Sequence, residues 1–197
     1  MEEDYSVGSS MAESDRRPAG AASPTPPIPS GYLSAADLES ARASVPIMCV
    51  DLVPVRNGAS GNAEVGLVLR QMPGRHEPVW CHLGGRVRRG ETLRAALLRH
   101  LGETLNGAGV ELPPDPQPAC VVQYFPTTES VEPGLDAGYD PRQHSIALVY
   151  RVSLIGEPTA VAGGEGIEFR WWDVRDVGSV ATVWPGTLQT VRGALGL

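Results

Sequence analysis

The chain has 197 residues, of which 42% are hydrophobic, and a formal net charge of −7 at neutral pH. This length and apolar content suffice for one domain with its own core and argue against two full-sized domains. The negative charge argues against a general nucleic-acid-binding protein, because such proteins use basic surfaces that displace counterions from phosphates. All 16 basic residues are arginine, which either codon usage or a preference for the phosphate-binding guanidinium would explain.

The cysteines and the apolar runs indicate where the protein works. Cys49, Cys81 and Cys120 lack the paired spacing of a zinc site or a disulfide framework, so we expect buried, reduced thiols. No apolar run approaches the ~18 residues of a membrane span, and the acidic N-terminus does not resemble a signal peptide. We therefore expect a cytoplasmic protein without a membrane partner.

The chain divides into a tail and a domain. Residues 1–30 are rich in Ser, Gly, Ala and Pro and bury too little apolar surface to offset the entropy of ordering, so a disordered tail is predicted. Residues 31–197 form the predicted domain, which opens with a helix at 33–45 capped by Ser34.

The rest of the domain alternates strands, turns and two further helices. Residues 126–142 are long for a connection, which is typical of a substrate loop or, equally, of a surface loop without a role. Helices are predicted at 91–105 and 185–195. Runs of β-branched and aromatic residues predict strands at 47–55, 64–71, 79–83, 119–125, 144–154 and 168–173.

A glycine pair links the third predicted strand to the second predicted helix. Gly84 and Gly85 let the backbone turn sharply and approach a ligand closely, because no Cβ is present. Glu91 is expected to enter the N-terminus of that helix, where a carboxylate is favoured by the helix dipole.

Two stripes run along this helix. One is apolar and should pack in the core, while the opposite one is polar and faces outward. Carboxylates on successive turns beside a glycine loop can hold Mg²⁺, although an ordinary surface helix with ion pairs four residues apart is the simpler explanation of the stripe alone. The stripes consist of Leu93, Leu97, Leu101 and Leu105, and of Glu91, Ala95, Arg99 and Glu103.

The spacing of Gly85, Glu91, Arg99 and Glu103 resembles the Nudix box, G-x5-E-x7-R-E-U-x-E-E-x-G-U, where U is a bulky aliphatic residue. The resemblance implies an α/β fold, the Nudix α/β/α sandwich with a mixed central sheet and the box helix opposite the C-terminal helix. The match is incomplete, because His100 and Thr104 stand where the family has glutamates and residues 106–107 lack the closing Gly and aliphatic pair.

Residues 32–173 also resemble the GDP-mannose mannosyl hydrolase branch of this family, which has an imperfect box of its own. The likeness runs through the first strand with its aspartate, through the glycine loop and through residues 169–171. In that branch one box glutamate holds a single Mg²⁺. The resemblance implies that the substrate is contacted by Asp51, Arg70, Arg86 and Arg99.

Oxygen ligands for a metal are expected from two parts of the chain. The resemblance implies Mg²⁺, with Mn²⁺ as an alternative, bound by Glu103, the Gly85 carbonyl and Glu165, and completed by water. Glu165 lies in a glycine-rich loop just before the last predicted strand, so a solvated loop glutamate is an equally good explanation.

Histidines are candidates for the base that activates water, because a neutral imidazole accepts protons near pH 7. His100 occupies the position of the family's usual base, and His144 follows the long loop. A hydrogen-bonded structural histidine is the alternative for both. His76 and His82 have no supporting context in the sequence.

The resemblance implies a hydrolase acting on a small nucleotide-type molecule, a nucleoside diphosphate linked to another group, with a nucleotide sugar as one example. The alternative is an inactive Nudix module that binds a nucleotide or metabolite as a sensor or pathway accessory, which the missing box glutamates favour. The sequence also leaves room for a homodimer.

Overall fold

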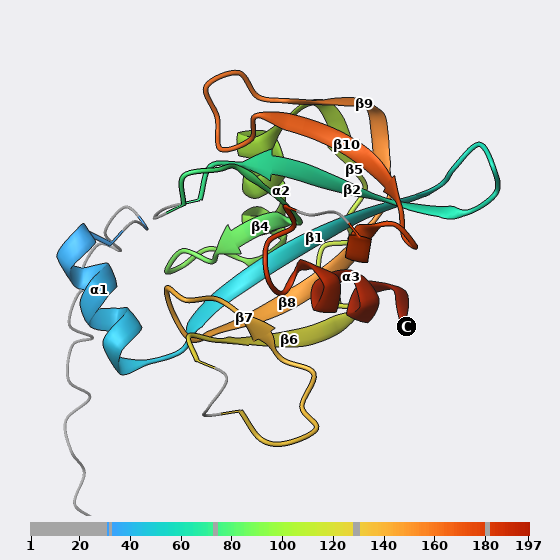
Figure 1. Ribbon diagram of the computed structural model, residues 1–197. Coiled ribbons are helices and arrows are strands. Elements are labelled where there is room, and N and C mark those ends of the chain that lie inside the picture. Colours follow the sequence, from blue (N-terminus) through green and yellow to red (C-terminus); the bar gives the residue numbers. More distant parts are fainter. Residues whose placement is uncertain (1–30, 32, 73–74, 128–130, 180–181) are drawn as a thin grey trace, which may run out of the picture.

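The computed structural model describes residues 31, 33–72, 75–127, 131–179 and 182–197, so the predicted tail at 1–30 lies outside the described residues. Three helices and one 3-10 turn occur in this part of the chain (Figure 1): α1 (Ala35–Ser44), α2 (Leu93–Thr104), α3 (Thr187–Leu195) and η1 (Val177–Ser179). None of these helices is long and apolar enough to cross a membrane. The strands are β1 (Ile47–Asn57), β2 (Ala63–Arg70), β3 (Val79–Cys81), β4 (Leu83–Arg86), β5 (Leu105–Val110), β6 (Cys120–Phe125), β7 (Gly138–Tyr139), β8 (Ser145–Val152), β9 (Leu154–Ala160) and β10 (Glu168–Asp173).

A curled mixed sheet forms the centre of the molecule, with the order β10-β2-β1-β8-β6-β7. Strand β1 pairs in parallel with β8 and antiparallel with β2 and β4, and β3 pairs with β2. Residues 49–55 of β1 are all buried, as expected for a strand covered on both faces. The predicted mixed sheet is thus confirmed, and β1 positions the functional site because β4 and its glycines lie directly beside it.

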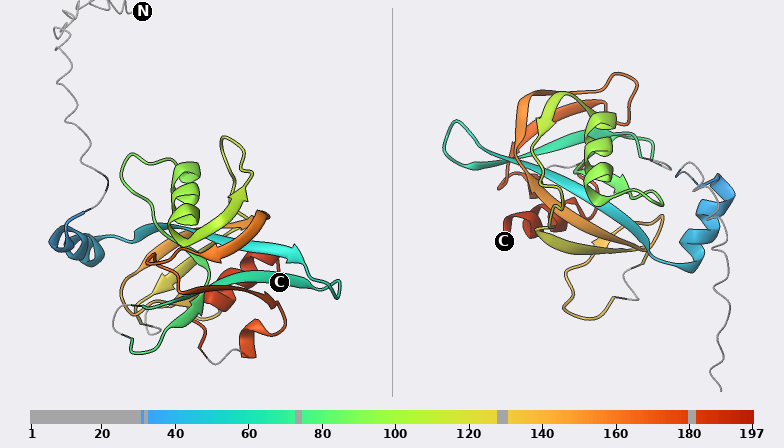
Figure 2. Two further views of the ribbon diagram at one scale, coloured as in Figure 1. Left: turned by 90° about the horizontal axis from the view of Figure 1, so that it is seen from above. Right: turned by 180° about the vertical axis from the view of Figure 1, so that it is seen from behind.

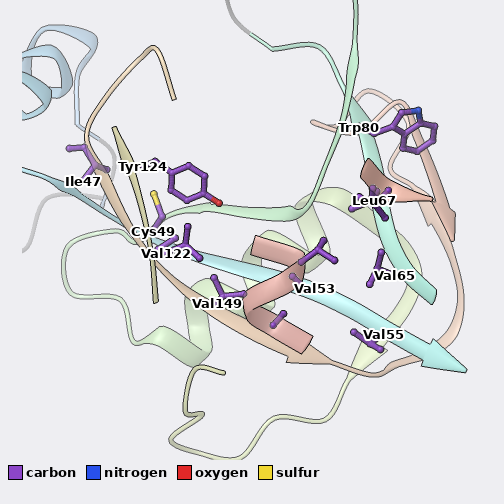
Figure 3. Packing of buried hydrophobic residues seen from close by; sticks show 14 residues of the cluster. Ile47, Cys49, Val53, Val55, Val65, Leu67, Trp80, Val122, Tyr124 and Val149 are labelled. Atoms are coloured by element: carbon purple, nitrogen blue, oxygen red, sulfur yellow. The ribbon is translucent and has the colours of Figure 1, made fainter. Parts of the chain in front are cut away.

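Helices α2 and α3 cover opposite faces of the sheet, which the two views of Figure 2 show. On the α3 side, Cys49, Val53 and Val149 belong to the cluster drawn in Figure 3. On the other side, Leu97 and Leu101 of α2 pack into a second cluster around β1. The predicted α/β/α layering is confirmed, and the predicted leucine stripe is buried at Leu97, Leu101 and Leu105 and partly buried at Leu93.

Helix α1 lies apart from these layers at the start of the domain (Figure 1). The predicted cap is confirmed, because the Ser34 hydroxyl oxygen accepts from the backbone N–H of Asp37 at 3.1 Å. None of the ten residues of α1 is buried. A hydrogen bond of 2.9 Å from Arg42 Nε to Gln143 Oε1 connects this helix to the body of the domain.

The structure corrects several element boundaries. The box helix begins at Leu93, not at Glu91, because Thr92 is the N-cap and accepts from the backbone N–H of Ala95 at 3.1 Å. The predicted strand at 79–83 is two strands separated by His82. Strands β5 and β9, which pair in a separate small sheet, and the short strand β7 inside the predicted long loop were not expected.

Candidate functional site

Arg99 on α2 ties the glycine loop to the helix. Its Nε and Nη2 donate to the two carboxylate oxygens of Glu91, both at 2.7 Å, and Nη2 also donates to the carbonyl of Arg86 at 3.0 Å. Glu91 accepts a further bond from the backbone N–H of Arg88 at 3.0 Å. These bonds, that of Arg99 first, lower the pKa of Glu91 from 4.5 to about 2. Glu91 is therefore ionised, and its role in this structure is to hold the loop in place.

Glu103 is the more accessible carboxylate of the box. It lies in the last turn of α2, where its side chain is 37% exposed. Oε1 accepts from Arg88 Nη2 at 3.0 Å and Oε2 from Arg99 Nη1 at 3.1 Å. Two guanidinium groups thus hold this carboxylate while a ligand can still reach it.

His100 packs directly beneath the glycine loop. A Cβ on Gly85 would lie 2.8 Å from His100 Cε1, so only glycine allows this close approach. His100 Nε2 lies 3.1 Å from the Arg86 carbonyl oxygen, and burial, followed by the charge of Arg99, lowers the pKa of the imidazole. A neutral His100 therefore supports the loop, and its predicted role as a base stays a prediction.

Glu165 reaches the same region from the loop before β10. The backbone N–H of Val161 donates to the Thr104 carbonyl at 3.0 Å, and a Cβ on Gly164 would lie 2.8 Å from the Glu103 carbonyl oxygen. This loop is therefore fixed against the end of α2. Glu165 itself forms an ion pair with Arg70 of β2.

A single large cavity connects these groups. Its volume is about 860 Å³, within the range of pockets that hold ligands of nucleotide size. Its lining carries seven arginines against four carboxylates, whereas the whole chain has a charge of −7. The cavity is therefore a positively charged region of an acidic protein. The charged residues that line it are Arg42, Arg70, Arg86, Arg88, Arg89, Arg99 and Arg142, with Asp51, Glu103, Asp140 and Glu165.

Arg86 is the arginine of this cavity with the clearest capacity for a ligand. It is half-buried at the end of β4, and within the described part of the chain its guanidinium has no carboxylate partner and no hydrogen bond. Burial, followed by the neighbouring charge of Arg42, lowers its pKa. A partly buried guanidinium without a counter-ion favours binding of an anion. The anion would supply the hydrogen bonds that water no longer makes and the negative charge that no protein carboxylate provides.

Asp51 and His82 form a pair on the cavity wall. The sequence pointed to Asp51 as a site residue but not to His82. Asp51 comes from β1, and His82 lies between β3 and β4. His82 Nε2 is 3.1 Å from Asp51 Oδ2, and its Nδ1 is 3.4 Å from the hydroxyl of Thr187 at the start of α3. The pairing of β1 with β4, which places Asp51 opposite Gly84, brings the two side chains together.

The loop between β7 and β8 supplies a second group that the sequence did not reveal. The Asp140 carboxylate accepts from Arg142 Nε at 2.8 Å, from its Nη2 at 2.7 Å and from its backbone N–H at 3.0 Å. The Arg142 guanidinium also lies over the Trp184 ring, 5.1 Å from its centroid. This part of the predicted long loop therefore lines the cavity in an ordered arrangement.

His144 and the three cysteines have no evident chemical role in the functional site. This differs from the prediction for His144 and agrees with the prediction for the cysteines. The His144 ring stacks on Phe125 at 4.6 Å and does not belong to the cavity lining, which argues against the predicted base role. Cys49 and Cys81 are buried free thiols, as predicted, whereas Cys120 is a free thiol that is only partly buried. Burial raises the pKa of Cys49 to about 12 and that of Cys81 to about 11, so neither is a thiolate nucleophile.

The predicted metal ligands, Gly85, Glu103 and Glu165, all belong to the cavity lining. The carboxylates of Glu103 and Glu165 are 37% and 49% exposed. Within the described residues no group of three His, Cys, Asp or Glu side chains could hold a metal. Two carboxylates and a backbone carbonyl nevertheless form an all-oxygen set that suits one hydrated Mg²⁺, provided that it displaces the arginines from Glu103 and Glu165.

Comparison with known proteins places the chain in a family. A family model described as a domain of unknown function, DUF4916, matches residues 28–195. The chain belongs to the DUF4916 family. No protein with a curated description is significantly similar to it.

Solved structures show the fold of this DUF4916 protein. It is 32% identical to a protein from Jonesia denitrificans described as a possible asymmetric diadenosine tetraphosphate hydrolase, over 78% of this chain and 94% of that one, with a TM-score of 0.63. A MutT Nudix hydrolase from Burkholderia pseudomallei is 20% identical over 76% and 98% of the two chains, with a TM-score of 0.57. The Nudix domain of Shewanella oneidensis NrtR, solved with ADP-ribose, is 18% identical over 83% and 98%, with a TM-score of 0.53. The DUF4916 chain thus has the Nudix hydrolase fold.

Proposed function

We propose that the chain is a Nudix-type hydrolase that acts on a nucleoside diphosphate linked to a second group, such as a sugar, and requires Mg²⁺, with Mn²⁺ as a substitute. The observation that carries this proposal is the guanidinium of Arg86, which has no ion-pair or hydrogen-bond partner among the described residues and lies beside the glycine loop of an arginine-rich cavity. Two phosphates in sequence fit such a cavity, because guanidinium groups bind phosphate oxygens through paired hydrogen bonds.

The relatives support a nucleotide as the ligand. The protein from Jonesia denitrificans is described by a dinucleotide substrate, and the Nudix domain of NrtR was solved with ADP-ribose. In both descriptions a diphosphate or longer phosphate chain joins two larger groups. The resemblance of Asp51 and Arg70 to the GDP-mannose mannosyl hydrolase branch makes a nucleotide sugar one candidate of this class.

In this proposal the residues of the cavity have separate roles in binding phosphate, holding the glycine loop and binding the cation. Arg86 binds phosphate oxygens, while Arg99 keeps the glycine loop against α2 through Glu91. Glu103 and Glu165, with the Gly85 carbonyl, would hold the cation, which when bound neutralises charge on the diphosphate. Arg88 and Arg70, released from these carboxylates, then become available to the phosphates.

Glu103→Gln tests the metal assignment. The substitution removes the negative charge and keeps the shape, so we expect loss of Mg²⁺-dependent hydrolysis across a panel of nucleotide sugars and dinucleotides, with an unchanged unfolding transition. Glu157→Gln, an exposed residue of β9 outside the cavity, is the matched control. Full activity of Glu103→Gln would contradict the assignment.

A binding module without hydrolysis is the second candidate, and one observation favours it. The two cavity carboxylates nearest the box, Glu103 and Glu165, are each paired with an arginine, and so is Glu91 behind the glycine loop. In a sensor these pairs would persist when the nucleotide binds. Calorimetry with and without Mg²⁺, followed by product analysis, distinguishes the two, because a sensor binds nucleotide without turnover.

A further inference from the structure

Helix α1 is attached to the body of the domain along one narrow stripe (Figure 1). None of its ten residues is buried, and only Leu38, Ala41 and Arg42 are partly covered. Their spacing of three and four residues places them on one face of the helix. Within the described residues, one hydrogen bond connects α1 to the body, from Arg42 Nε to Gln143 Oε1. Because an isolated helix of this length is only marginally stable in water, the position of α1 depends on these few contacts.

The covered stripe of α1 borders the large cavity. Leu38 and Arg42 line it, and so does Pro46, which belongs to the two-residue connection between α1 and β1. Val45, the other residue of this connection, is extended and 56% exposed. A weakly attached helix that lines a cavity and follows a short exposed connection has the construction of a lid.

Arg42 brings a positive charge to the cavity without a buried counter-ion. Its side chain is 26% exposed, whereas that of its ion-pair partner Glu39, 3.4 Å away, is 76% exposed. Its other partner, the amide oxygen of Gln143, is neutral. Because an ion pair with so exposed a carboxylate stabilises little, the charge of Arg42 is poorly compensated within the protein.

The charge of Arg42 acts on Arg86, the cavity arginine without a carboxylate partner among the described residues. Both line the cavity, and the charge of Arg42 is, after burial, the largest cause of the lowered pKa of Arg86. Two like charges so placed disfavour the position of α1 on the cavity. An anion between them would be attracted by both, and phosphate oxygens match guanidinium groups through paired hydrogen bonds.

We propose that α1 is a lid that a phosphate-bearing ligand closes, with Arg42 from α1 and Arg86 from β4 binding the same phosphate chain. This inference rests on the proposed function and adds control of access to the same site. In the free protein the repulsion between the two guanidinium groups favours opening of the lid. Bound phosphates reverse this balance and hold α1 on the cavity, so the ligand shifts the population towards the closed form.

Hydrogen exchange of the α1 amides, followed by mass spectrometry, tests this proposal without requiring turnover. The full chain in EDTA is compared free, with ADP, GDP or UDP, and with the corresponding nucleosides, which lack phosphate. Calorimetry gives each affinity first, so that every measurement with a diphosphate is made at saturation. The variants are Arg42→Gln and Arg42→Lys, whose folding is checked by thermal unfolding. Arg192→Gln, an exposed arginine of α3 outside the cavity, is the matched control.

We expect at least one diphosphate, and none of the nucleosides, to slow exchange of α1 by about 10-fold in the wild type and in Arg192→Gln. Arg42→Gln should bind that diphosphate more weakly by about the same factor, because closure and binding share one coupling free energy. At saturation the α1 amides of Arg42→Gln should exchange as fast as without ligand. Arg42→Lys keeps the charge and should retain part of the slowing.

The outcomes separate this inference from the proposed function. Unchanged exchange of α1 in the saturated wild type, or full slowing in Arg42→Gln, would overturn the lid and leave the proposed function standing. Equal slowing by a nucleoside would also overturn it, since closure would then not depend on phosphate. Failure to bind ADP, GDP and UDP would overturn the proposed function and this inference with it.

Discussion

Replacement of Glu91 by glutamine removes the charge that fixes the glycine loop to α2. In the wild type, Glu91 accepts two bonds of 2.7 Å from Arg99 and one of 3.0 Å from the Arg88 backbone. Its pKa is lowered from 4.5 to about 2, which sets an upper bound of about 3 kcal/mol on the stability gained at pH 7, and solvent screening of the pair reduces this to about 1–2 kcal/mol. We therefore expect Glu91→Gln to unfold with a free energy lower by about that amount at pH 7.

The pH dependence gives this prediction its sign. Because the pKa of Glu91 is lower in the folded state, the stabilisation is complete above pH 4.5 and disappears as the pH falls through about 2. Roughly half of the difference between wild type and variant should remain at pH 3. Urea unfolding followed by tryptophan fluorescence at pH 7 and pH 3 measures it.

An exposed ion pair provides the control. Glu168 and Arg170 form a pair at 2.6 Å on the surface of β10, and Glu168→Gln should change stability by less than about 0.5 kcal/mol. Equal stability of Glu91→Gln and wild type at pH 7, or a difference that persists unchanged at pH 3, would refute the role given to the Glu91 carboxylate.

Two further substitutions test the framework around the cavity. Leu97→Ala empties a fully buried position between α2 and the sheet, so we expect a loss of about 2–5 kcal/mol in chemical unfolding; a loss below about 1 kcal/mol would show that α2 does not pack as described. Gly84→Ala places a Cβ 2.3 Å from the Val50 carbonyl oxygen at a φ of +136°, so thermal unfolding should show a loss of about 2 kcal/mol or more. A neutral Gly84→Ala would contradict the pairing of β1 with β4.

The sequence predicted the elements whose side chains repeat with a clear period. The leucines at 93, 97 and 101 lie in α2 as predicted, although the helix starts two residues later than expected and Leu105 already belongs to β5, and the run at 168–173 matches β10. Strands β5 and β9 were not predicted because they contain residues typical of turns. Gly107 and Gly156 have φ of +67° and +89°, and the pairing register shifts after Asn106. Their pairing is a tertiary effect that overrides local preference.

The site was predictable only where its residues lie close together in the sequence. The box spacing identified Gly85, Arg99 and Glu103, and all three line the cavity. It could not show that His82 meets Asp51, since a contact between residues so far apart depends on β1 pairing with β4. The aspartate in the first strand and the histidine two residues before the glycine pair were the available signals.

The sequence predicted only some of the ion pairs of the box, because the others join residues that the fold brings together. A helical stripe predicts that Arg99 meets Glu103 one turn later, and it does. The stronger pair with Glu91 depends on how the loop folds back before Thr92 caps the helix. The helical spacing of charges therefore predicted the ion pair within α2, between Arg99 and Glu103, whereas the ion pair between Arg99 and Glu91 depends on the geometry of the loop.

Turnover in ¹⁸O-labelled water tests the central claim most directly. The protein is incubated with Mg²⁺ and the nucleotide derivative that it binds most tightly, and the products are analysed by mass spectrometry. We predict two products, one of which carries a single ¹⁸O atom in the phosphate or in the group attached to it, and neither of which forms in EDTA. Tight binding with no labelled product would contradict hydrolysis and identify the protein as a nucleotide-binding module.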